Sequence, residues 1–450
     1  MQKEDFLNAD ISFKNINKLA IPALIAGIAE PILSITDIAI IGNIDSNATE
    51  SIAAVGIVGA FISMLIWVLG QVRSAISSII SQYVGANKLD QVKELPAQAI
   101  AIVVLGSLFI LAISYPFSRQ IFQFYNASGQ ILEYCIAYFN IRIFGFPFAL
   151  FVFAIFGTFR GLQNTFYPMI IAIIGASLNI VLDIILVYGI EGFIPAMNVE
   201  GAAYASVIAQ ITMALIAVLL LIKKTPISLK IGSSLHPEIP KLLNMIGNLF
   251  IRTIALNSAL YFATSYATGY GKEYIAAYTI SLNIWLLGAF MIDGYSSAGN
   301  ILSGKLLGAK DYKTLVHLST KLFKYSIIIG VLVAVIGFGF YGFIGRIFTQ
   351  EKLVLEQFDS VFWLILITQP INAITFIFDG MFKGMGEMKY LRNLLILSTG
   401  LVFIPTLLIF DYFDYKLIAI WMAFALWIIA RGLPLILKFR NTFLPLAKKQ

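Results

Sequence analysis

The sequence predicts an all-α polytopic membrane protein with twelve transmembrane helices in two homologous six-helix lobes. Three observations support this prediction. The 450 residues are 59% hydrophobic and only 12% charged, about half the charged share of an ordinary soluble domain. Apolar runs of about twenty residues or more, each long enough to cross a bilayer core, recur from end to end. Several short sequences also return at one constant offset along the chain.

Hydropathy places the helices in order, and glycine and proline interrupt many of them. The first eighteen residues are polar, and the apolar run that follows is long enough to stay as a span, which argues against a cleaved signal peptide. The second helix is too long for one perpendicular crossing and is expected to tilt or protrude. The predicted ranges are 19–42, 51–84, 92–115, 132–157, 167–189, 200–222, 244–268, 275–302, 320–345, 357–380, 391–410 and 417–437.

The lysines and arginines predict how the helices are oriented. Most of these residues lie at the two termini and in one set of connecting loops, and the opposite set carries few. The positive-inside rule therefore predicts a multi-pass protein of the cytoplasmic membrane with both termini in the cytoplasm. The same distribution accounts for the net charge of +7 without a nucleic-acid partner. The basic residues of the opposite loops are Arg119, Lys272, Arg346, Lys352 and Lys416.

An internal repeat divides the chain. "SAISSIISQYVGANK" (74–88) aligns with "SAGNILSGKLLGAKD" (297–311), and "FRGLQNTFY" (159–167) aligns with "FKGMGEMKY" (382–390). Both alignments have an offset of 223 residues. Because the offset contains six helices, an even number, the two lobes keep the same orientation. A pseudo-two-fold axis along the membrane normal should relate them, as in transporters built from parallel repeats.

The repeat predicts three parts of the chain: an amino-terminal lobe (1–222), a cytoplasmic linker (223–241) and a carboxy-terminal lobe (242–450). In parallel-repeat transporters the ligand site lies near the membrane midplane between the lobes, and access alternates between the two sides of the membrane. Channels and membrane enzymes have less need of two such halves. The duplication therefore favours transport before any residue is given a role.

Ionisable residues inside the predicted helices mark a candidate site. Asp37, in "EPILSITDIAIIG", lies near the bilayer centre, where an aspartate costs roughly 2.5–3.5 kcal/mol on insertion scales. Glu30 precedes it by two helical turns and shares its face. In "SLNIVLDIILVYG", Asn179 and Asp183 are four residues apart and also share a face, and Ser206 could add a hydroxyl.

Carboxylates that cluster in a low dielectric cannot all ionise, because desolvation and mutual repulsion favour protonation of at least one. Such a cluster could carry a proton, and the oxygens of Asp37, Asn179 and Asp183 could instead hold Na⁺. A structural alternative remains open at this point. Buried arginines could neutralise Asp37 and Asp183, and the candidates are Arg73, Arg142 and Arg252.

The second half of the chain offers further candidates. Asp293, in "FMIDGYSSAGN", lies deep in a predicted helix and is a candidate for substrate binding or gating, as is Arg252. Asp379 lies four residues before Lys383, near the cytoplasmic edge, and this spacing favours a structural ion pair.

Motifs of enzymes and metal sites are missing from the sequence. The one cysteine (Cys135) and two histidines (His236 and His317) argue against a disulfide framework or a Cys/His metal site. H-E-x-x-H, G-x-S-x-G and Walker A motifs are also missing, so we expect neither an enzyme nor a bound cofactor. Energy for transport would come from an ion gradient.

The chain resembles the multidrug and toxic compound extrusion (MATE) family, and within it the DinF-like branch. The resemblance covers nearly the whole chain and rests on four stretches: "AIPALIAGIAEPILSITDIAIIG", "GFPFALFVFAIFGTFRGLQNT", "SLNIVLDIILVYG" with "VEGAAYASVIAQ", and "FIFDGMFKGMGEMKYLRN". It implies the MATE fold and an antiporter that exports organic compounds, of which amphipathic cations are the expected class, in exchange for H⁺ or Na⁺.

The resemblance also implies roles for single residues. It places ion coupling on Asp37, Asn179, Asp183 and Ser206, although relatives often carry threonine at the last position. Glu30 stands where a neutral polar residue is expected, and this extra acid would take part in ion coupling by strengthening cation attraction or by carrying a second proton. Pro22, fifteen residues before Asp37, would let the first helix bend when the site changes its protonation.

Two other functions stay open from the sequence: a lipid-linked precursor flippase of a related class, and a membrane receptor that does not transport. A flippase would need a larger, strongly basic cavity for pyrophosphate, whereas acids outnumber bases among the candidate residues of the amino-terminal lobe. The duplicated lobes argue against the receptor. The expected partners are a small organic substrate and the lipid bilayer. An obligatory protein partner is not expected, and a monomer would suffice.

Overall fold

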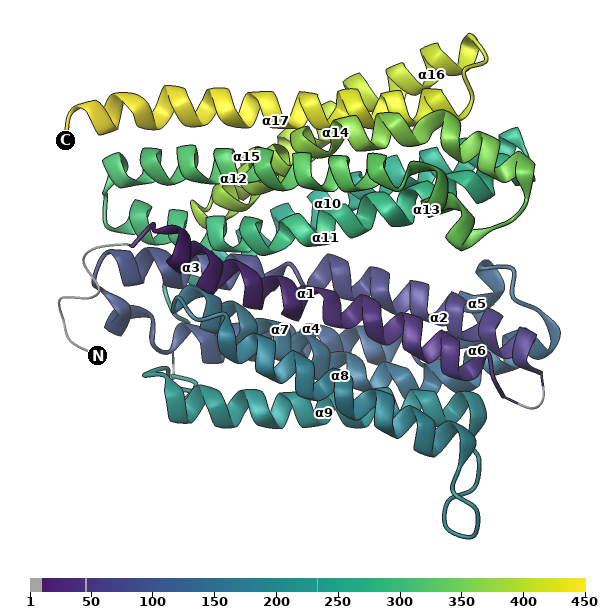
Figure 1. Ribbon diagram of the computed structural model, residues 1–450. Helices are drawn as coiled ribbons and strands as arrows, with labels where there is room; N and C mark the ends of the chain where they lie inside the picture. The colour runs from purple at the N-terminus through teal and green to yellow at the C-terminus, as the bar shows by residue number, and fades with distance from the viewer. Residues whose placement is uncertain (1–9, 45–46, 233) are drawn as a thin grey trace. The chain divides into compact units, whose positions relative to one another are not determined.

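The computed structural model describes residues 10–44, 47–232 and 234–450, without the side chains of residues 30, 31, 34 and 35. This part of the chain is helical, apart from loops and one isolated β-bridge between Ile190 and Ile194. Eleven helical segments are long and apolar enough to cross a membrane, and α1 (Phe13–Ile41) adds a twelfth long helix (Figure 1). The predicted all-α polytopic fold is therefore confirmed.

The helices match the predicted spans and often extend beyond them. In the first half of the chain, α1 is followed by α2 (Ala48–Leu69), α3 (Val72–Gly85), η2 (Leu89–Val92), α4 (Leu95–Ser114), α5 (Ser118–Phe124), α6 (Gly129–Arg142), η3 (Ile143–Gly145), α7 (Phe146–Gly161), α8 (Phe166–Tyr188) and α9 (Asn198–Lys224). In the second half lie α10 (Ile239–Tyr270), α11 (Lys272–Gly308), α12 (Tyr312–Gly339), α13 (Tyr341–Phe348), α14 (Lys352–Gly384), α15 (Met388–Ser398), η4 (Thr399–Phe403), α16 (Ile404–Tyr412) and α17 (Leu417–Lys448).

Three predicted helices are interrupted. The long second span breaks at Gly70, where α2 ends and α3 begins, so its length reflects two helices in series. A short 3₁₀ segment, η3, separates α6 from α7 just before Pro147. The π-helical segment η4 precedes α16, which carries Pro405 in its first turn. Proline lacks the amide hydrogen needed for regular helical bonding, so breaks beside Pro147 and Pro405 are expected.

Contacts divide the chain into two compact units. We call Ile25–Ile80 with Lys88–Ile246 the amino-terminal unit, and Met1–Leu24, Ser81–Asn87 and Gly247–Gln450 the carboxy-terminal unit. These units group residues by contact, which is a different criterion from the sequence repeat. The lobe boundaries at 222 and 241 therefore stay a prediction.

Each unit packs helices around its own apolar core. In the amino-terminal unit α8 lies along α9, and α6 contacts both α2 and α9 (Figure 1). In the carboxy-terminal unit α14 is central and contacts α11, α12 and α17. Buried aromatic side chains fill both cores, and among the largest are Phe122, Phe139, Phe146, Phe358, Phe362 and Trp427.

Glycine contacts show that the sequence repeat is also a structural repeat. A Cβ added to Gly157 of α7 would lie 2.6 Å from the carbonyl oxygen of Arg73 on α3. Gly380 of α14, 223 residues later, approaches the carbonyl oxygen of Ser296 on α11 in the same way. Arg73 and Ser296 are also 223 residues apart. The same close helix crossing therefore occurs once in each repeat.

Reciprocal glycine contacts join α3 and α11 inside the carboxy-terminal unit. A Cβ on Gly85 would meet the carbonyl oxygen of Lys305, and a Cβ on Gly308 would meet the carbonyl oxygen of Gln82. Gly85 corresponds to Gly308, and Gln82 to Lys305, at the offset of 223. The two corresponding glycines therefore make equivalent backbone contacts where α3 crosses α11.

The polar linker of residues 223–241 is bonded to the amino-terminal unit at His236. The backbone amide of Glu238 donates to His236 Nδ1 at 3.1 Å, so Nε2 carries the ring proton. Nε2 then donates to the carbonyl oxygen of Gln91 at 2.7 Å. The backbone amide of His236 also donates to Gln98 Oε1 at 2.7 Å.

Candidate functional site

The amino-terminal unit brings together four predicted site residues from three helices. Asp37 lies on α1, Asn179 and Asp183 lie one turn apart on α8, and Ser206 lies on α9. All four side chains are buried, with Asp183 at 0% and Asp37 at 6% exposed. Asn179 Nδ2 donates to Ser206 Oγ at 3.4 Å. These residues come from sequence positions up to 169 apart, so helix packing alone creates the cluster.

Asp37 and Asp183 lie close enough to act on each other through their carboxyl groups. Neither oxygen of Asp183 has a hydrogen-bond donor in the described part of the protein, and Asp37 Oδ1 and Asn179 Oδ1 also lack one. Buried polar atoms normally have partners. A pair of carboxyl groups can bond to each other only when one of them is protonated. The cluster is therefore chemically suited to hold a proton, or a cation that oxygen atoms coordinate.

Two residues of α6 complete the surroundings of this cluster. Tyr138 and Arg142, one turn apart, both act on Asp37 through their charge or hydroxyl group. Arg142 Nη1 donates to Gln210 Oε1 at 3.0 Å, which directs one end of the guanidinium toward α9. Among the described residues, no arginine nitrogen lies within 4 Å of Asp37 or Asp183. Arg142 thus supplies nearby positive charge without a direct ion pair.

In the described ranges, no three His, Cys, Asp or Glu side chains lie together in a way that could hold a metal ion. A Na⁺ site would need the amide oxygen of Asn179 and the hydroxyl of Ser206 beside the two carboxylates. Hard monovalent cations accept such neutral oxygen ligands, so the donor set fits the ion.

The carboxy-terminal unit contains a second buried cluster around Asp379 of α14. Arg252 Nη2 on α10 lies 2.6 Å from Asp379 Oδ1, and Lys383 Nζ lies 3.0 Å from Oδ2. The predicted ion pair between Asp379 and Lys383 is confirmed. Arg252 was predicted as a residue that binds substrate or pairs with a buried acid, and its close contact is with the Asp379 carboxylate. Asp293 of α11 is half-buried and acts electrostatically on Lys383.

The remaining predicted residues have different placements. Pro22 lies inside α1, half-buried, in the part of that helix that belongs to the carboxy-terminal unit. The Glu30 side chain lies outside the described residues. Pro22 does not join the cluster of Asp37 in the described contacts.

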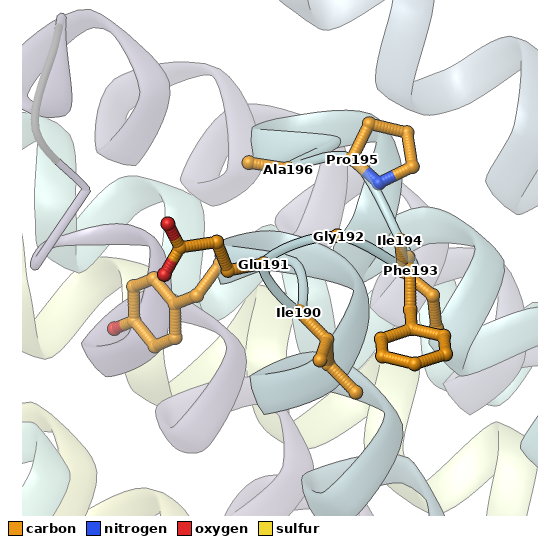
Figure 2. Close-up of a pocket in the computed structure, with 8 residues that line it drawn as sticks. Ile190, Glu191, Gly192, Phe193, Ile194, Pro195 and Ala196 are labelled. Atoms are coloured by element: carbon orange, nitrogen blue, oxygen red, sulfur yellow. The ribbon is translucent and has the colours of Figure 1, made fainter.

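A surface hollow near the end of α8 is separate from both clusters. It has a volume of about 540 Å³ and is lined by Tyr188 and residues 190–196 of the loop to α9 (Figure 2). Figure 2 shows the Glu191 carboxylate and the Phe193 ring at opposite sides of the loop. Glu191 is the one carboxylate that lines it, and none of the predicted site residues does. The hydroxyl of Tyr188 donates to the carbonyl oxygen of Ile40 at 2.8 Å, so the end of α8 is bonded to the end of α1.

Two residues of these clusters were not singled out from the sequence. Tyr138 precedes Arg142 by four residues, and this spacing could have placed both on one face of α6. Arg431, in the apolar stretch "LWIIARGLPLI", is a lone cation in the middle of α17. An ionisable residue in such a segment is itself a signal of function.

Comparisons with known proteins agree with this architecture. A family model described as MatE matches residues 22–185 and 249–409. The chain is 28% identical over 312 residues to Protein DETOXIFICATION 42 of Arabidopsis thaliana, covering 68% of this chain but only 59% of that protein. It is 26% identical over 429 residues to DNA damage-inducible protein F of Escherichia coli, covering 94% of this chain and 91% of the relative. A MATE crystal structure in the bent conformation superposes with a TM-score of 0.91 at 21% identity, covering 100% of this chain and 99% of that one.

Proposed function

Because the chain belongs to the MatE family, we propose that it is a secondary active antiporter that exports small organic compounds in exchange for H⁺ or Na⁺. The buried pair of Asp37 and Asp183 carries this proposal, since it supplies carboxyl oxygens without protein donors at a depth where isolated charge is costly. A site of this kind gains most by binding a proton or a cation. The chain is a multi-pass membrane protein, and the proposal locates it in the cytoplasmic membrane with both termini in the cytoplasm.

The coupling step uses the competition between two occupants of one site. When Asp37 and Asp183 share a proton or hold Na⁺, their combined charge falls from −2 to −1, which the nearby Arg142 can balance, and the surrounding helices can pack closely around them. When the ion leaves, two carboxylates face each other in a low dielectric and repel. The unit then favours a conformation that separates or rehydrates them, and a cationic group of the substrate can take the place of the ion. Binding of one occupant therefore releases the other.

The nearby Arg142 tunes this exchange. A positive charge close to the pair stabilises one carboxylate in its ionised form, so it offsets part of the repulsion between the two acids once the ion has left. Tyr138 offers a hydroxyl that can donate to Asp37 once the ion has left. Both side chains would position the carboxylates and adjust their affinity for the ion, while the carboxylates themselves bind it.

Purified protein in proteoliposomes tests the proposal. A pH gradient or a Na⁺ gradient is imposed in turn, and a fluorescent organic cation is followed in wild type, Asp37→Asn and Asp183→Asn. We expect gradient-driven transport in wild type and its loss in both variants, because an amide cannot release a proton. The gradient that drives transport identifies the coupling ion.

Asp90→Asn serves as the control, since Asp90 is 85% exposed and should leave transport unchanged. Each variant is checked for a monodisperse elution profile before the assay. Gradient-driven transport at the wild-type rate in the Asp37→Asn variant would refute the assigned coupling role. Binding of an organic cation without flux under any gradient would favour the receptor.

A further inference from the structure

The buried cluster around Asp379 contains more positive than negative charge. Arg252, Lys383 and Arg431 converge on this carboxylate from α10, α14 and α17. Asp293, which acts on Lys383, is the second acid nearby. Three cations against two acids leave an excess of one positive charge when all are ionised. Buried charge of one sign is costly unless it has a counter-ion.

Arg431 is the cation without a close partner. Both carboxylate oxygens of Asp379 are already used at 2.6 Å by Arg252 and at 3.0 Å by Lys383. Arg431 Nη2 lies 3.9 Å from Asp379 Oδ1, too far for a hydrogen bond. Both terminal nitrogens of Arg431 are buried and have no hydrogen-bond partner in the described part of the protein. The side chain is only 3% exposed.

Aromatic rings fix the position of this guanidinium. Its carbon lies 4.6 Å from the centre of the Trp427 ring and 5.9 Å from that of Phe376. Trp427 is held in turn, because its Nε1 donates to Thr399 Oγ1 at 3.0 Å, at the start of the π-helical segment η4. π-Helical turns occur often at functional sites. The two terminal nitrogens are therefore held beside apolar ring surface without an acceptor in the described part of the protein.

We infer that Arg431, with Trp427 and Phe376, forms a binding site for a small organic acid inside the carboxy-terminal unit. A carboxylate or sulfonate matches the fork of two terminal nitrogens, which can donate two parallel hydrogen bonds. The rings supply contact for an apolar body attached to the acid. Such a ligand would also neutralise the excess charge left by Arg252 and Lys383. This binding site lies in the other unit from the Asp37 cluster and does not depend on ion-coupled transport.

Three ligands that differ only in charge test this inference. The probes are tritiated p-toluenesulfonate, which is anionic, p-toluenesulfonamide, which is neutral, and 4-methylbenzylammonium, which is cationic. Equilibrium binding to purified wild-type protein is measured by scintillation proximity. We expect the sulfonate to bind about 10- to 100-fold more tightly than the amide, the range expected for charge-assisted hydrogen bonds. The ammonium ion should not compete with the sulfonate at Arg431.

Variants then locate the binding. Arg431→Gln should weaken sulfonate binding about 10-fold or more, and Arg431→Lys should give an intermediate loss because it keeps the charge without the fork. Arg346→Gln, at an exposed arginine of α13, is the matched control and should bind as wild type does. Asp37→Asn should also keep sulfonate binding, so a failed antiporter assignment would leave this result intact.

Two outcomes would overturn the inference. The first is equal binding of sulfonate and sulfonamide by wild type, which needs no variant and so does not depend on folding of a mutant. The second is unchanged sulfonate affinity in a folded Arg431→Gln protein.

Discussion

Removing the carboxylate of Asp379 should strongly destabilise the protein, because two buried cations contact this acid and a third lies 3.9 Å away. Asp379 is 6% exposed, and its ion pair with Arg252 measures 2.6 Å. Breaking a buried pair by removing one partner costs about 3–5 kcal/mol, because the other charge stays buried without a counter-ion. In Asp379→Ala, Arg252, Lys383 and Arg431 would all lose this partner. We therefore expect a loss of about 3 kcal/mol or more in the free energy of unfolding.

The chain offers a matched control for this effect. Arg119 and Glu133 form a pair of similar length, 2.8 Å, but their side chains are 51% and 56% exposed. Solvent screens such pairs, so Glu133→Ala should cost less than about 1 kcal/mol. Both variants can be compared by equilibrium unfolding in mixed micelles of increasing sodium dodecyl sulfate fraction. Equal losses for Asp379→Ala and Glu133→Ala would show that burial does not decide the value of these ion pairs, and the reasoning would fail.

Three further predictions concern helix packing, the linker and the start of α1. Gly157→Ala should lose about 1–3 kcal/mol of stability in the same unfolding assay, because its Cβ would lie 2.6 Å from a backbone oxygen of α3, whereas Gly56→Ala, with open space around it, should not be destabilised. His236→Ala removes the ring bonds of the linker, so trypsin should cut the linker several-fold faster, and an unchanged rate would contradict the assigned contacts. The amide and hydroxyl of Ser12 hold the pKa of exposed Asp10 below its usual value of about 4. The bonds to Asp10 should therefore be complete above about pH 4 and lost as the pH falls through the lowered value, so acid should lower the hydrogen-exchange protection factor of the Ser12 amide in wild type more than in Asp10→Ala.

The helical fold could be predicted from the sequence because the bilayer leaves few choices. In hydrocarbon every backbone polar group must be bonded within the chain, so an apolar run of about twenty residues becomes a helix. The internal repeat was equally readable, since glycines at the helix crossings, such as Gly157 and Gly380, tolerate no larger residue and return at a fixed offset. The interruption at Gly70 was less visible, because glycine is common inside intact membrane helices.

The candidate site could be predicted in part. Asn179 and Asp183 lie on one helix, so their four-residue spacing predicted that the two side chains share a face. Asp37 could be identified because it is an acid in an apolar helix. These residues lie near Tyr138 and Arg142 only because α1, α6 and α8 pack together, and this packing cannot be predicted from spacing along the chain. The same holds for the carboxy-terminal cluster, where spacing predicted the pair of Asp379 and Lys383 on one helix.

The sequence by itself determined the helices, their repeat and the acids buried within them, because these follow from hydropathy and from the cost of charge in a bilayer. Only the tertiary structure decided which charges are neutralised. Arg252 could have paired with Asp37 or Asp183, but packing placed it 2.6 Å from Asp379. That choice left two carboxyl groups facing each other in one unit and Arg431 without a close partner in the other. Charge pairing depends on separations of a few ångströms between helices, and such distances arise only when the helices are packed.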